Sequence, residues 1–131
     1  MNMFDKLLSK KMDMFKIMVT LQDELNGKFS LSSREISEME LDERLIWIRK
    51  YMEAAVIEVG EVIMAAKGRW WKIDKDYKGM ENVREEIIDL LHFVLAAGLA
   101  SGMTAEDIFE RYCDKNQRNH TRKDWAINNE P

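Results

Sequence analysis

The chain has 131 residues, a length that indicates one domain whose core can form without disulfides or a structural metal. Hydrophobic residues make up 46%, charged residues 34% and the formal net charge is -4, a globular composition without a basic surface for nucleic acid. The lone cysteine, the charged amino-terminal segment and the lack of a long uninterrupted apolar stretch favour the cytoplasm and argue against a membrane protein.

Four long helical patterns run along the chain, because its one proline is Pro131 and most glycines fall between periodic segments. The first pattern covers about residues 4–25, with apolar residues at steps of three and four. It is expected to stop near Asn26 and Gly27, and a polar connector, KFSLSSREISEME, follows it.

The second helix is expected over about residues 41–67, with Gly68 as its carboxyl-terminal stop. Residues 69–81 form a loop rich in lysine, aspartate and aromatic residues. The third helix is expected to take Asn82 as its cap and to end near residues 101–102. Both central helices are apolar around much of their circumference, which is typical of helices covered on a second side by the bundle or by another copy of the chain.

Thr104 is the expected cap of the fourth helix, which fades near Asn119. The tail, about residues 120–131, lacks a clear period, and we expect it to be flexible. Because no repeat, low-complexity tract or linker divides the chain, residues 1–131 are predicted to form a single all-α domain. The expected architecture is a compact four-helix-type bundle that pairs as a homodimer.

Two pairs of acidic residues interrupt the apolar central helices. The first pair, in EVGE, is Glu58 and Glu61, and the second, in EEIIDLLHF, is Glu86 and Asp89. Residues three apart lie on one helix face, so antiparallel packing of the two helices would bring four carboxylates together. Such carboxylates repel one another unless a cation joins them, and an all-oxygen ligand set suits Mg²⁺ or Mn²⁺. For either pair alone, the alternative interpretation is a solvated helix edge.

Cations and tryptophans follow these acids along the chain. Lys72 closes the segment KGRWWK, whose two tryptophans offer aromatic faces beside positive charge. Lys115, Asn119 and Arg122 step by four and three residues, so on a continuous helix they share a face and bind an anion together. The alternatives are ordinary packing for the tryptophans and solvated helix-end charge for the cations.

The order EVGE, KGRWWK, EEIIDLLHF and YCDKNQRNHTRK, over about residues 15–123, resembles the all-α nucleotide pyrophosphohydrolase superfamily, and within it the dimeric dUTPases. The segment TLQDELN is similar to the glutamine-and-asparagine segment of that family. The resemblance implies a cytoplasmic, homodimeric, Mg²⁺-dependent enzyme that hydrolyses dUTP to dUMP and pyrophosphate; a phage enzyme would act in the host cytoplasm. It implies no nucleic acid and no membrane as partner. The alternatives are a broader or dCTP-preferring deoxynucleotide pyrophosphohydrolase and a non-catalytic module that senses nucleotides or binds proteins.

The resemblance also implies a role for each matching residue. Those implied to coordinate Mg²⁺ are Glu58, Glu61, Glu86 and Asp89. Those implied to contact the phosphates and sugar are Lys72, Lys115, Asn119 and Arg122. Those implied to contact the base are Gln22, Asn26, Trp47, Trp70 and Trp71, where the amides suit the uracil edge because each offers a donor and an acceptor. Glu61, with Glu58 beside it, would help to generate the hydroxide that attacks the α-phosphorus.

Overall fold

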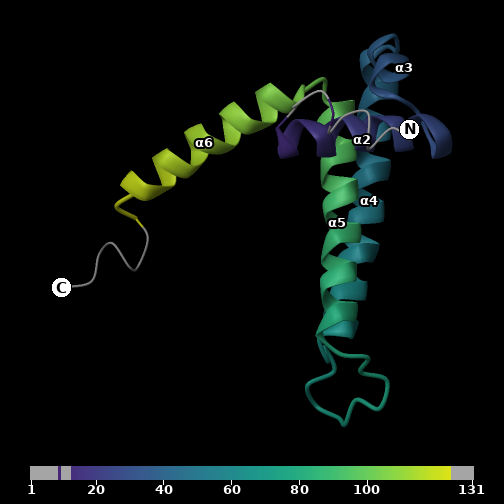
Figure 1. Ribbon diagram of the computed structural model, residues 1–131, viewed down its shortest axis with the longest axis vertical. Helices are drawn as coiled ribbons and strands as arrows, with labels where there is room; N and C mark the ends of the chain where they lie inside the picture. The colour runs from purple at the N-terminus through teal and green to yellow at the C-terminus, as the bar shows by residue number, and fades with distance from the viewer. Residues whose placement is uncertain (1–8, 10–12, 125–131) are drawn as a thin grey trace.

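The computed structural model describes residue 9 and residues 13–124, and within this part of the chain every element is a helix. The helices are α2 (Met14–Phe29), α3 (Ser33–Ser37), α4 (Leu41–Ala65), α5 (Met80–Ala100) and α6 (Ala105–Thr121). Helices α4 and α5 form a long antiparallel hairpin, α2 and α3 lie at its end remote from the joining loop, and α6 projects to one side (Figure 1). The prediction of an all-α fold is confirmed.

Small residues let the two helices of the hairpin approach closely. Ala96, Ala97 and Ala100 of α5 are buried in one cluster with Tyr51 of α4 and Ile36 of α3. Without long side chains between them, the helix backbones can pack near the short end of the usual interaxial distance. The carboxyl-terminal half of α5 is therefore the centre of the molecule, and α2 and α3 cover it.

A second cluster fixes α2 and the start of α6 to the same part of α5. It comprises Val19 of α2, Leu95 and Leu99 of α5, and Ala105 of α6. Only the first turn of α6 takes part, because every residue of the chain from 109 to 124 is exposed. The hairpin and α2 thus form the framework, from which α6 extends.

The boundaries of α2 and α3 differ from the sequence prediction. Helix α2 continues through Asn26 and Gly27 to Phe29, where a stop was expected, and the side chain of Gln22 donates a hydrogen bond to Asn26 Oδ1 over 2.7 Å across its last turns. This side-chain bond along one helix face supports another turn. The connector contains the short helix α3, capped by reciprocal hydrogen bonds between Ser32 and Glu35. The expected start near residue 4 lies outside the described residues.

The ends of the hairpin helices also differ in detail. Helix α4 ends at Ala65, and Lys67, not Gly68, adopts the left-handed conformation, with a φ of 60°. Gly68 fits at this position because it has no side chain: a Cβ there would lie 2.6 Å from the carbonyl oxygen of Ile63. The prediction that Asn82 caps the next helix is wrong, because α5 begins at Met80 and Asn82 lies inside it.

The predicted cap of α6 is confirmed. The backbone N–H of Asp107 donates to Thr104 Oγ1 over 3.1 Å, and the backbone N–H of Thr104 donates to Asp107 Oδ2 over 2.9 Å.

Within the described residues no single helix is long and apolar enough to cross a membrane, although α5 and α6, bent by 106° at their junction, pass that test as a pair.

Candidate metal and nucleotide site

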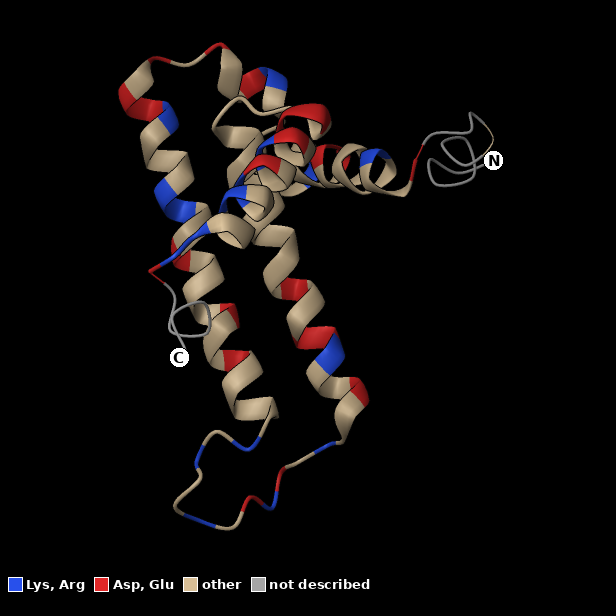
Figure 2. Cartoon of the chain, turned by 90° about the vertical axis from the view of Figure 1, so that its left-hand side faces the viewer, with Lys and Arg blue, Asp and Glu red and all other residues tan. Residues whose placement is uncertain are grey.

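Three of the four predicted acids converge between the helices of the hairpin. One carboxylate oxygen each from Glu58 of α4 and from Glu86 and Asp89 of α5 lie within 4.8 Å of one another. Glu58 reaches this point because it follows the buried Tyr51 and Ala55 at helical spacing and therefore shares the side of α4 that faces α5. Acidic residues are accordingly found on both helices of the hairpin (Figure 2).

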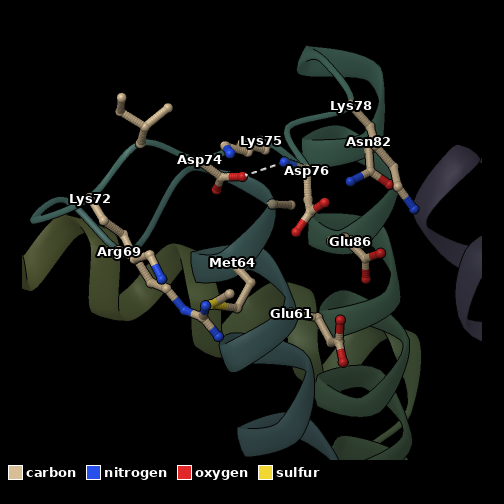
Figure 3. Close-up of a pocket in the computed structure, with 12 residues that line it drawn as sticks. Glu61, Met64, Arg69, Lys72, Asp74, Lys75, Asp76, Lys78, Asn82 and Glu86 are labelled. Atoms are coloured by element: carbon tan, nitrogen blue, oxygen red, sulfur yellow. Dashed lines mark hydrogen bonds between the residues drawn. The ribbon is translucent and has the colours of Figure 1, made fainter.

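Glu61, the fourth acid, lies one turn further along α4 towards the loop and is exposed. It lines a cleft of about 480 Å³ together with Glu86. In Figure 3 these two side chains extend into the cleft from facing helices. Glu86 thus belongs both to the group of three acids and to this cleft, and it connects them.

The surroundings of Glu86 disfavour its charge. Its partial burial is the largest cause that raises the pKa of this carboxyl, followed by the negative charges of Asp89, Glu61 and Glu58, while Lys78 acts in the opposite direction. Among the described residues, no ion pair joins any of the four acids to a lysine or arginine. Carboxylates with this much uncompensated charge and no sulfur or nitrogen ligand among them fit a hard divalent cation.

Basic residues from the α4–α5 loop line the same cleft. Lys72, one of the residues implied to contact phosphate, lies there with Arg69 and Lys78. Asn82, which sequence reasoning took as a helix cap, lines it as well, one turn before Glu86 on α5. That spacing of four residues was the signal that could have identified Asn82, whereas nothing local in the sequence indicates where the loop lysines lie.

The predicted base-binding amides lie beside the acids on their other side. A pocket of about 520 Å³ is lined by residues of α2, α4 and α5, among them Gln22, Asn26, Glu58 and Asp89. Gln22 and Asn26 are buried, with only 6% and 5% of their surfaces exposed. Three segments distant in sequence therefore bring two amides and two carboxylates to one pocket.

The amide of Asn26 has an unsatisfied donor. Gln22 Nε2 donates to Asn26 Oδ1 over 2.7 Å, which fixes the orientation of the Asn26 amide, and Asn26 Nδ2 has no hydrogen-bond partner among the described residues. A buried donor left without an acceptor costs about 1–3 kcal/mol. An acceptor that reaches Asn26 Nδ2 would remove this cost.

Comparison with known families agrees with this arrangement. A family model described as dUTPase matches residues 14–102, most of the chain. The chain belongs to the dUTPase family. The matched part includes all four acids, the amide pair and the loop between α4 and α5, and it ends before α6. Comparisons with curated proteins and with solved structures gave no match.

The three tryptophans that the resemblance to dUTPases implies for base contact do not line the pocket of the amides in this dUTPase-family chain. Trp70 and Trp71 are exposed on the loop, with ring centroids 5.5 Å apart, and they do not line the pocket of the amides. Trp47 packs against the core beside Tyr51, whose ring centroid is 5.8 Å away. The structure instead places other aromatic side chains in that pocket, namely Phe29, Tyr51 and Phe93.

Sequence reasoning missed Tyr51 and Phe93, although Phe93 follows Asp89 by one helical turn and that spacing was visible. Tyr51 is held by a 2.7 Å hydrogen bond between its hydroxyl and Ser30 Oγ, which ties α4 to the end of α2. His92 also lines the pocket, and its Nδ1 lies 2.8 Å from the carbonyl oxygen of Ile88. The other ring nitrogen of His92, Nε2, does not take part in this contact with Ile88.

The implied phosphate contacts on α6 are separated from the acids. Lys115 and Asn119 of α6 and Arg122, which follows the helix as its C-cap, are exposed, and α6 extends away from the hairpin (Figure 1). None of them lines the cleft of Glu61 or the pocket of the amides. Arg122 donates two hydrogen bonds to the carboxylate of Asp124, and this contact raises the pKa of Arg122.

Proposed function

We propose that this chain is a Mg²⁺-dependent dUTP diphosphatase that acts as a homodimer and hydrolyses dUTP to dUMP and pyrophosphate. The observation that carries the proposal is the buried, unsatisfied Asn26 amide, which lies in one pocket with two of the three converging carboxylates. A base-recognition group and a metal-ligand group thus adjoin in a member of the dUTPase family.

Glu58, Glu86 and Asp89 are the proposed ligands of the metal, with Glu61 next to them. Bound Mg²⁺ would neutralise the charge of the triphosphate and lower the pKa of a coordinated water; Mn²⁺, which accepts the same ligands, should replace it. The fit rests on the all-oxygen donor set and on the partial burial and like charges that together raise the pKa of Glu86.

Glu61 is the proposed general base. Its carboxylate is exposed to the cleft and so is accessible to water and substrate. It accepts a proton as the water oxygen attacks the α-phosphorus, and the bond from that phosphorus to the bridging oxygen of pyrophosphate breaks. Lys72, Lys78 and Arg69 line the same cleft, and their positive charges would neutralise the departing pyrophosphate.

The orientation of the amide pair favours uracil over cytosine. Because Asn26 Oδ1 already accepts from Gln22, the Asn26 amide offers the base a donor. Uracil presents carbonyl acceptors at both O2 and O4, whereas cytosine carries an amino donor in place of O4. A donor directed at that position leaves cytosine unpaired, and this unpaired contact would discriminate against dCTP.

Pyrophosphate release from dUTP, dCTP and dTTP, with Mg²⁺ and with excess chelator, tests the proposal. We expect a kcat/KM for dUTP at least about a hundredfold above that of dCTP, because a site built for one hydrogen-bonding edge rejects the other strongly. Chelation should abolish turnover. Hydrolysis of none of the three nucleotides would refute the enzyme, and comparable turnover of dCTP would assign a broader or dCTP-preferring pyrophosphohydrolase.

An exposed apolar stripe on α4 supports the homodimer. It repeats at steps of three, four and seven residues and consists of Leu45, Met52, Val56, Val59 and Ile63. This spacing is that of a helix face that packs against other helices. In α5, Ile87 and Val94 are also exposed, so the hairpin leaves apolar surface on both helices for a second copy.

A further inference from the structure

A second polar cavity lies at the end of the molecule remote from the α4–α5 loop, where residues of all five described helices meet (Figure 1). Its volume is about 510 Å³, and it shares no lining residue with the cleft of Glu61 or with the pocket of the amides. None of the residues implied to bind metal, phosphate or base lines it. The charged side chains that do so are Lys16, Asp23, Arg34, Arg44 and Glu106.

Both acids of this cavity already have partners. Asp23 accepts hydrogen bonds from the backbone N–H and the hydroxyl of Ser33, each over 2.7 Å. Glu106 forms an ion pair with Lys16 at 3.2 Å. With three cations and two carboxylates among its lining residues, the cavity has one positive charge in excess. The excess charge is carried by the two arginines.

The guanidinium of Arg44 is held at the cavity with few hydrogen bonds. Arg44 is half-buried near the start of α4, and its Nη2 donates to the carbonyl oxygen of Ala100, at the end of α5, over a long 3.4 Å. Gly102 leaves room for this group, since a Cβ there would lie 2.9 Å from Arg44 Nη2. In the described part of the chain no ion pair joins Arg44 to a carboxylate. Because a guanidinium has five N–H donors, most of them are available to a ligand.

Arg34 supplies a second guanidinium, from α3. Its ion pair with Glu38, at 3.8 Å, joins two largely exposed side chains and is easily exchanged for another anion. Planar guanidinium groups bind the oxygens of a phosphate in pairs, and two arginines suit a group that carries more than one negative charge. We propose that this cavity binds a phosphate group through Arg44 and Arg34, either as inorganic phosphate or as the phosphate of a nucleotide.

Titration with inorganic phosphate, followed through the backbone amide shifts in NMR spectra of the full chain, tests the site. Chelator is present throughout, so that phosphate cannot bind through Mg²⁺ at the acids. We expect a saturable shift of the Gly102 amide and a Kd that is raised about ten- to a hundredfold in Arg44→Gln, which loses charge-assisted hydrogen bonds. Arg34→Gln should raise the Kd about two- to fivefold, because its side chain is largely exposed.

Two control variants and a second ligand sharpen the test. Arg49→Gln removes an exposed arginine from the same helix, and Lys72→Ala removes a cation of the catalytic cleft. Both should leave the Kd at Gly102 unchanged. The same titration with dUMP separates the two sources of phosphate: binding tighter than that of inorganic phosphate assigns the site to a nucleotide, and equal or weaker binding assigns it to free phosphate.

The phosphate site fails if the Gly102 amide responds only as it does to chloride at equal ionic strength, or if neither arginine variant changes the Kd. If circular dichroism shows that Arg44→Gln does not fold, Arg34→Gln decides alone, since it keeps the bond from Arg44 to Ala100. None of these measurements requires turnover, so their result is independent of the proposed diphosphatase activity.

Discussion

The four acids share one spacing in the sequence but occupy different surroundings. Glu58 and Glu86 are half-buried between the helices, and Asp89 and Glu61 are exposed. Only Glu61 stands outside the group whose carboxylate oxygens lie within 4.8 Å of one another. This difference in position predicts a difference in role between metal binding and proton transfer.

Substitution of single acids should separate these two roles. Asp89→Asn is expected to raise the Mg²⁺ concentration for half-maximal turnover by at least about tenfold, since even outer-shell partners of a metal ligand change affinity by that amount. Glu61→Gln should instead lower kcat by about 10²–10⁴ at saturating Mg²⁺, the usual contribution of a general base. Initial rates over a Mg²⁺ titration measure both effects. Identical titration curves for the two variants would contradict the division of roles.

The amide pair can be tested without loss of the fold. In Gln22→Leu/Asn26→Leu both partners of a buried hydrogen bond become apolar groups of similar shape, a change that is nearly neutral or stabilising. We expect unchanged or higher thermal stability together with at least about a hundredfold loss of discrimination between dUTP and dCTP. Retained discrimination in this double variant would exclude the amides from base recognition.

The acids could be predicted from the sequence because spacing along a helix fixes their side of that helix, whereas the amide pair was indicated only by the family resemblance of the segment TLQDELN. The sequence could not place Trp70 and Trp71, because the course of the fourteen-residue loop between Ala65 and Met80 depends on tertiary contacts that no local pattern encodes. Tyr51 was missed for a related reason: a buried aromatic residue on an apolar helix looks like ordinary core, and the pocket beside it appears only once α2 is in place.

The end of α4 depends on the space around one glycine. A methyl group at Gly68 would lie 2.6 Å from the carbonyl oxygen of Ile63, which belongs to the backbone and cannot rotate away. Gly68→Ala should therefore destabilise the protein by about 1–3 kcal/mol, as overpacking does. Gly60→Ala is the matched control, because Gly60 lies inside α4 with nothing near its missing Cβ. There, alanine should stabilise the helix by about 0.5–1 kcal/mol, and urea unfolding would compare the two. Equal changes in the free energy of unfolding would contradict the steric role of Gly68.

The first turn of α6 should make stability depend on pH. Hydrogen bonds from the backbone and the hydroxyl of Thr104 hold the pKa of Asp107 below its usual value of 3.8. Because the folded chain then binds fewer protons than the unfolded chain, this carboxylate contributes stability above that usual value. The contribution is lost as the pH falls through the lower pKa of the folded state.

Asp107→Asn should therefore lower Tm at pH 7, and its difference from wild type should shrink steadily as the pH is lowered below about 4. Thermal unfolding by circular dichroism at several pH values measures this change. Thr104→Ala removes the partner and should cost about 1 kcal/mol at neutral pH, the typical value of a helix cap. A difference between Asp107→Asn and wild type that stays constant down to pH 3 would contradict the linkage.

The helix ends show which local signals are sufficient. The Thr104 cap was predictable because its partner, Asp107, lies three residues away and needs no tertiary contact. Asn82 carried an equally good local signal but lies inside α5, because Gly79 with a φ of 99° begins the helix earlier. Asn82 instead lines the cleft together with Glu86, and the packing of the hairpin sets that position.

At the scale of the whole molecule, the single chain leaves too much apolar surface exposed on its longest helix. On α4, 70% of Val56 and 65% of Ile57 are exposed, next to the acids that the proposed reaction uses. A contiguous patch of this kind marks an interface. A second hairpin on this surface would form a four-helix bundle from two chains, whereas the sequence predicted a four-helix-type bundle within one chain.

Val56→Lys should therefore dissociate the homodimer, because a lysine at the centre of an apolar contact loses its solvation without gaining a partner. Sedimentation equilibrium is expected to give the mass of a monomer for this variant and of a dimer for the wild type. Mg²⁺ binding to the acids of each hairpin should persist in the monomer, because the three converging carboxylates belong to one chain.

Glu43→Lys also introduces a lysine on α4, at an exposed residue of its first turn, and changes the charge by two units instead of one; it is the control and should remain an active dimer. A wild-type protein that sediments as a monomer would contradict the interface on α4. A Val56→Lys variant that still sediments as a dimer would exclude Val56 from that interface.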